Sequence, residues 1–303
     1  MACPVTLEPR AAQELSLLRY LMRTVLQSMK EIVVLCGIIC FSVAASAQCK
    51  FTTLNIPGAI GSFATGNNDQ GAIVGAFSPI TGGTSGFLLF QGKFTHFSFP
   101  GGDNTVAEGI NNLAQIVGDY TNSTGQHGFV VHNGAFHSIS DPAAPSQTQA
   151  LSINNFGTIV GSAGAFGFRL SRGHFTTIRF PGSTHTVAAG INDFGVIVGT
   201  YINNGDHGFM LKNGTYTAIN FPGADGTSVS RINNEGDIVG TYHIHGDLHG
   251  FSLDKGRFLT HDDPSGITTI IIGVNKFDTM VGGFVADNEG HEHSFKATCA
   301  GVF

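Results

Sequence analysis

Residues 110–118 read INNLAQIVG, a turn-forming segment followed by a short apolar strand, and close variants of this stretch recur along the chain. The asparagine that leads each copy is residue 67, 111, 154, 192, 233 or 275, so the copies are 38 to 44 residues apart. Asn-Asn-x-Gly segments favour tight hairpin turns, and Ile-Val-Gly is typical of a buried strand. A period of this length indicates a chain built from structural repeats.

Two further motifs complete each repeat. One is a small residue before a phenylalanine, as in Gly128-Phe129, and the other is an aromatic-led strand that ends in proline, as in residues 94–100. Each repeat therefore supplies four short strands, A to D in chain order. Strand D is apolar on both faces, which indicates a sheet covered on both sides. The sequence predicts an all-β fold, a six-bladed β-propeller within residues 48–303.

The two ends of the repeat region each hold part of a repeat. Residues 51–57 form a strand D that lacks its A, B and C, whereas residues 294–298 form a strand C that lacks its D. We therefore expect the N-terminal strand to complete the last blade, which removes an open sheet edge. Alignment with residues 129–136 places Cys49 and Cys299 at neighbouring positions of the missing hairpin, so a disulfide is expected between them.

The residues before the repeats indicate export. Residues 29–47 have the features of a secretory signal peptide: a charged start, an apolar run over residues 32–43 and an Ala-x-Ala cleavage site. That run is shorter than the ~20 residues of a membrane-spanning helix. We expect a mature chain from Gln48 without a membrane anchor, secreted or held in the periplasm or cell envelope. Residues 1–28 are interpreted as a non-native upstream extension.

The motif order resembles a known repeat family. His-Gly-Phe, then Gly-x-Phe, then Gly-Ile-Asn-x-x-Gly-x-Ile-Val-Gly is similar to the HAF-type extracellular repeat of bacterial secreted proteins, over residues 51–295. The chain departs from that pattern because glycine replaces the name-giving alanine at positions 128, 208 and 250, and tryptophan is absent. The resemblance implies export and a repeat-built β architecture, and it carries no catalytic residues.

Strand alternation divides the connections between the two faces of the predicted ring. The A–B and C–D turns, short and repetitive, lie on one face, here called the turn face. The B–C and D–A loops lie on the other, the variable-loop face, and their B–C loops differ from blade to blade. Variable loops on a rigid scaffold are where binding usually resides.

Charged residues are rare in strand A, and two of them are candidate binding residues. Glu108 and Arg231 belong to blades expected to lie across the ring, where they either hold a ligand in the channel or are simply solvated. The Asn-Asn turns are also candidates for a glycan or calcium site. Their copying from repeat to repeat favours a structural role, in which the asparagine side chain bonds its own backbone.

Histidines suggest a metal site. His243, His245 and His249 lie in one B–C loop, and His291 and His293 lie in the next. Imidazole with nearby carboxylates suits a divalent transition metal. The alternative is structural, because four histidines share one repeat position before strand C: His127, His207, His249 and His293.

Composition and motifs exclude some classes of function. The formal net charge is −6 without a basic stripe, which argues against a nucleic-acid partner. A Gly-x-Ser-x-Gly nucleophile motif is absent from the sequence. We therefore expect a monomeric, non-enzymatic binding propeller that recognises an extracellular glycan or protein through its variable-loop face, without a cofactor. The alternative is an extracellular polysaccharide hydrolase or lyase with a divalent metal at the histidine loops.

Overall fold

The computed structural model describes residues 49–286 and 292–299, and all of its regular elements are strands. The predicted upstream extension (1–28), signal peptide (29–47) and metal ligand His291 lie outside the described residues. No stretch of the described chain forms a helix with the length and apolar character to cross a membrane.

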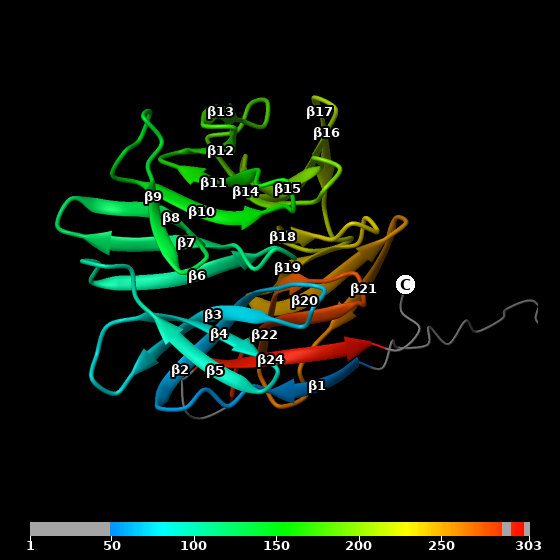
Figure 1. Cartoon of the computed structure of the whole chain (residues 1–303). Coiled ribbons are helices and arrows are strands. Elements are labelled where there is room, and N and C mark those ends of the chain that lie inside the picture. The colour runs from blue at the N-terminus through cyan, green and yellow to red at the C-terminus, as the bar shows by residue number, and fades with distance from the viewer. Residues whose placement is uncertain (1–48, 287–291, 300–303) are drawn as a thin grey trace, which may run out of the picture. The chain divides into compact units, whose positions relative to one another are not determined.

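The strands form six four-stranded antiparallel sheets, which are the blades of a β-propeller (Figure 1). Blades 1 to 3 comprise β2 (Ala59–Asn67), β3 (Ile73–Pro79), β4 (Ser85–Phe90), β5 (Lys93–Phe97); β6 (Asn104–Ile110), β7 (Ile116–Asn122), β8 (Gly125–His132), β9 (Ala135–Ile139); and β10 (Thr148–Ile153), β11 (Ile159–Ala163), β12 (Phe166–Ser171), β13 (His174–Ile178). Blades 4 to 6 comprise β14 (His185–Ile191), β15 (Ile197–Ile202), β16 (Asp206–Lys212), β17 (Thr215–Ile219); β18 (Gly226–Ile232), β19 (Ile238–Ile244), β20 (Asp247–Asp254), β21 (Arg257–His261); and β22 (Thr268–Val274), β23 (Thr279–Val285), β24 (Glu292–Cys299) with β1 (Cys49–Thr53).

The first strand of each blade contacts the first strand of the next, and β22 contacts β2, so the ring is closed. In Figure 1 the blue β1 runs beside the red β24, with which it pairs antiparallel. The N-terminal strand therefore completes the last blade, as the sequence predicts. Cys49 lies directly opposite Cys299 and is joined to it by a disulfide, which confirms the predicted pairing.

The Ile-Val-Gly and Gly-Phe motifs explain how each blade packs internally. Phe129 lies opposite Gly118 on the neighbouring strand and is fully buried. A Cβ on Gly118 would overlap both the Phe129 ring and the backbone carbonyl of Val106. Glycine is therefore required where the phenylalanine crosses strand B. The hydrophobic core forms between blades: one cluster joins Val160 and Ile178 of blade 3 to Ile191 and Phe209 of blade 4.

One asparagine per blade joins the six A–B turns into a ring of side-chain amides. Each Nδ2 donates to the backbone carbonyl of the equivalent asparagine in the next blade, at 3.0 to 3.2 Å, and the cycle closes from blade 6 to blade 1. We call this set the asparagine ring; its members are Asn68, Asn111, Asn154, Asn192, Asn233 and Asn275. All six are at most 6% exposed.

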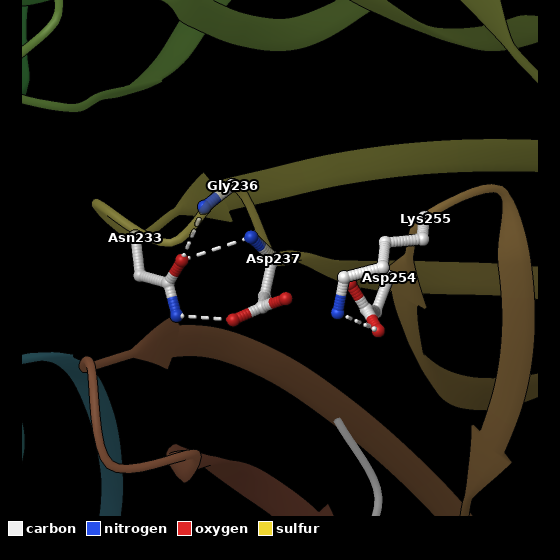
Figure 2. Close-up of polar contacts among 5 residues, drawn as sticks. All are labelled: Asn233, Gly236, Asp237, Asp254 and Lys255. Carbon is white, nitrogen blue, oxygen red and sulfur yellow. Dashed lines mark hydrogen bonds and ion pairs between the residues drawn. The ribbon is translucent and has the colours of Figure 1, made fainter.

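The same asparagines shape their own turns. Figure 2 shows that Asn233 Oδ1 accepts hydrogen bonds from the backbone nitrogens of Gly236 and Asp237, at 2.9 and 2.8 Å. The predicted structural role of the Asn-Asn turns is thus seen, together with a bond between blades that the motif did not reveal. The predicted register in blade 1 was wrong by one residue: Asn68, not Asn67, is the ring member, because Asn67 is the last residue of β2.

Replacing Asn154 by aspartate separates the two roles. The variant keeps an oxygen for the turn and loses the Nδ2 donor, which leaves a buried carboxylate against the Asn192 carbonyl. We expect Asn154→Asp to lower the free energy of unfolding by about 2–4 kcal/mol, measured by chemical denaturation. Asn213→Asp, at an exposed C–D turn, is the matched control and should change it little. Equal effects of the two substitutions on the free energy of unfolding would contradict a role of Asn154 in joining blade 3 to blade 4.

Candidate functional site

The side chain of Arg231 lies on the propeller axis. It belongs to β18, the innermost strand of blade 5, and is 8% exposed. Its two terminal nitrogens donate hydrogen bonds to one backbone carbonyl in each of blades 1 to 4, those of Thr65, Glu108, Leu151 and Ala189. Burial lowers the pKa of Arg231 to about 10, against the opposing effect of Glu108, so the guanidinium is charged at neutral pH. Four carbonyl dipoles compensate this buried charge.

The other blades have a small residue where blade 5 has Arg231. Opposite the valine of each Ile-Val-Gly motif stand Gly66, Gly109, Ser152, Gly190 and Gly273. A Cβ on Gly109 would lie 2.9 Å from the carbonyl oxygen of Leu151, so the inner strands approach one another closely at this level. The axis therefore accommodates one long side chain, and blade 5 supplies it.

Glu108 and Arg231 belong to blades 2 and 5, and the guanidinium of Arg231 crosses the axis to the backbone of Glu108. Arg231 Nη2 donates to the Glu108 carbonyl oxygen at 2.7 Å, and the guanidinium is buried. The alternative of simple solvation was therefore wrong for Arg231, because four backbone carbonyls replace its water. A role of the two residues in holding a ligand stays a prediction.

Glu108 on β6 and Asp119 on the neighbouring strand β7 influence each other electrostatically. Desolvation raises the pKa of Glu108 to about 7, with a further contribution from Asp119 and an opposing one from Arg231. Asp119 is 4% exposed; Gln126 donates to one carboxylate oxygen at 2.8 Å, and the other oxygen has no hydrogen-bond partner within the described chain. Burial also raises the pKa of Asp119. Two acids with raised pKa values are a feature of reactive sites and of strained structural clusters alike.

The histidines that the sequence analysis placed before strand C lie within that strand, in β8, β16, β20 and β24. His127, His207 and His249 each lie against a tyrosine of strand B, with ring centroids 5.1 to 5.4 Å apart. His249 Nδ1 also lies 3.0 Å from an Asp262 carboxylate oxygen, while His293 lies against Phe284 at 5.3 Å. This arrangement supports the structural alternative for the shared histidine position.

The metal prediction for His243, His245, His249, His291 and His293 stays a prediction. In the described parts of the chain, the one group of three potential ligands with atoms within 4.8 Å of one another is Cys49, His261 and Cys299. The four described histidines of the prediction thus form no such group among these residues, and His291 lies outside them. The proximity of His261 to Cys49 and Cys299 had no signal in the repeat pattern, because it joins blade 5 to the strands that close the ring.

A pocket of about 400 Å³ opens on the variable-loop face between blades 6 and 1. Its described lining combines apolar residues, the exposed Ile60 and the half-buried Phe63, with the polar residues Ser78, Thr84 and Glu292. Sequence reasoning chose this face, and Glu292 is one of the carboxylates near its histidines, but the other lining residues were not singled out. They belong to the ends of strands, and only ring closure brings β24 beside β2.

The turn face carries a second feature that the sequence analysis missed. Large apolar side chains stand exposed at the third position of four A–B turns, at 63% for Leu113, 78% for Phe156, 76% for Phe194 and 63% for Phe277. These turns surround the axial mouth that the asparagine ring borders. The sequence did contain a signal for these exposed side chains: each is an apolar residue within a polar turn motif, where turns ordinarily take polar residues.

The raised pKa of Glu108 predicts a pH-dependent stability. Between about pH 4.5 and about 7 the folded chain keeps a proton that the unfolded chain has lost, so this group destabilises the fold as pH rises. Glu108→Gln removes that dependence. We expect the variant to gain up to roughly 3 kcal/mol of unfolding free energy relative to wild type between about pH 4 and about pH 8, by urea denaturation. A variant-to-wild-type difference that is constant with pH would contradict this.

No protein-family model and no curated protein matches the chain. Solved structures match it in fold. A streptogramin B lyase has 10% identity and a TM-score of 0.52, with 83% of this chain and 97% of that chain covered. A gluconolactonase from Xanthomonas campestris has 11% identity and a TM-score of 0.51, covering 85% and 93%. The β-propeller domain of the trilobed protease from Pyrococcus furiosus, with an open velcro topology, has 9% identity and a TM-score of 0.51, covering 79% and 94%. Identities this low show the fold alone: the chain is a β-propeller.

Proposed function

We propose that the protein is an exported, non-enzymatic binding propeller of the HAF-type repeat class that recognises a glycan through its variable-loop face. The observation that carries the proposal is the mixed lining of the pocket between blades 6 and 1. Sugars present apolar C–H faces and hydroxyl edges, and a binding site for them needs both an apolar surface and polar groups placed to fix orientation. Phe63 and Ile60 supply the first, and Thr84, Ser78 and Glu292 supply the second.

The negative charge of the pocket favours neutral glycans over acidic ones. Glu292 brings a carboxylate to the pocket, and the whole chain has a formal net charge of −6. An acidic polysaccharide would meet like charge, whereas sugar hydroxyls can donate to the carboxylate. The proposed ligand is therefore a neutral glycan. Two features favour a binding protein over the hydrolase or lyase: the axis is filled by Arg231, and Glu292 is the one acidic residue among the described residues that line the pocket.

The support for export is independent of the pocket. The Cys49–Cys299 disulfide joins the ends of the propeller, and such bonds persist in oxidising compartments. A secreted, periplasmic or cell-envelope location places the protein where it can meet extracellular glycans.

A glycan array followed by calorimetry tests the proposal. We expect mature protein to bind neutral glycans, and Glu292→Gln and Thr84→Val each to weaken binding by about tenfold through loss of one hydrogen bond. Phe194→Ser on the turn face is the control and should leave affinity unchanged.

Weakened binding in Phe194→Ser with normal affinity in both pocket variants would move the site to the other face. Failure to bind any glycan would exclude the proposal in favour of a protein ligand, and cleavage of a bound glycan would establish the enzyme alternative.

A further inference from the structure

Blade 5 departs from the repeat at the two buried positions that face the disulfide. Blades 1 to 4 have an apolar residue opposite the strand C glycine, namely Phe97, Ile139, Ile178 and Ile219, whereas blade 5 has His261. Two residues after that glycine, blade 5 has the buried Ser252, whereas blades 1, 2 and 4 have Leu88, Val130 and Met210 and blade 3 has the exposed Arg169. His261 is 2% exposed and Ser252 is fully buried. A polar pair has thus replaced an apolar one at the junction with blade 6.

This pair points an imidazole at the sulfur atoms. His261 Nδ1 lies 3.2 Å from Cys49 Sγ, and its other ring nitrogen lies 2.7 Å from Ser252 Oγ. The two sulfurs and a ring nitrogen of His261 all lie within 4.8 Å of one another. When Nε2 carries the proton and donates it to Ser252, Nδ1 presents its lone pair to both sulfurs. A hydroxyl that accepts the proton of the other ring nitrogen in this way orients a histidine that ligates a metal.

We propose that in the reduced chain Cys49, Cys299 and His261 form a binding site for zinc or a similar thiophilic divalent ion. Two thiolates and one imidazole are a ligand set typical of zinc, and the fourth position of a tetrahedral ion is open to water because both cysteines are only half-buried. The structure shows the oxidised state, in which the same sulfur atoms are bonded to each other.

The chemistry that links the two states is thiol–disulfide exchange. A dithiol supplies two electrons, the bond between the two sulfur atoms breaks, the dithiol becomes a disulfide, and each cysteine gains a proton. Zinc binding then releases the two thiol protons to solvent. A newly synthesised chain already has both thiols, so it reaches the metal-binding state without a reductant. In either state a bridge joins β1 to β24: a disulfide after oxidation and a metal ion before it.

Metal titration of the full mature protein tests the site. Protein reduced with a dithiol, then freed of it under anaerobic conditions, is titrated with Zn²⁺ by calorimetry and with Cd²⁺ by the ultraviolet charge-transfer absorption of metal thiolates. We expect one ion per reduced chain and a raised unfolding midpoint with Zn²⁺. The oxidised protein should show neither the absorption band nor the stabilisation.

The double variant His261→Ile/Ser252→Val is the matched control, since other blades have these residues at the equivalent positions. It keeps both cysteines and a packed junction, so we expect it to fold, as checked by circular dichroism, and to bind Zn²⁺ at least tenfold more weakly than reduced wild type. Cys299→Ser leaves one thiolate at the site, so the cadmium–thiolate absorption band should lose the intensity that two thiolates give. Reduced wild type that binds no more tightly than the double variant, or that gives no thiolate band, would overturn the proposal.

Discussion

The hydrogen bond from the amide of one blade's asparagine to the backbone of the next is the contact on which the ring depends. Because each asparagine ring member also fixes its own A–B turn through Oδ1, the shape of a turn and its distance from the neighbouring turn are set by a single side chain. In this closed cycle each of the six asparagines donates to the next blade and accepts from the previous one. The inner strands are thereby held close enough that glycine is needed where they meet.

That closeness determines what the channel can contain. With small residues at five of the six axial positions, the carbonyl groups of the inner strands face a narrow space, and the guanidinium of Arg231 fills it by bonding four of them. The channel is therefore a packed core at this level and not a passage. Ligand recognition is left to the two faces, where the pocket beside Glu292 and the exposed apolar turn residues lie.

The repeat pattern was sufficient to predict the architecture because each local signal had a direct counterpart in the blades. Turn residues, strand periodicity and the incomplete repeats at the ends gave the number of blades, the closing strand and the disulfide. Arg231 was noticed as a rare charge, yet its partners are backbone carbonyls, which have no signature in sequence. The pocket was missed for a related reason: Phe63 and Glu292 are far apart in the chain and become neighbours only when the ring closes. His261 replaces an isoleucine of the strand D motif, which the sequence alone displays, but its contact with Cys49 appears only in the structure.

The axial arginine also restricts how this repeat architecture can change. Repeat proteins commonly gain or lose units by duplication and deletion, and a propeller with an open axis can absorb such events by adjusting its diameter. Here one guanidinium contacts four other blades at hydrogen-bond distance. In a wider ring those carbonyls would lie beyond the reach of the guanidinium, which would leave a buried cation without hydrogen-bond partners. A narrower ring would have no space for the side chain. The length of this single side chain is thus matched to a ring of six blades.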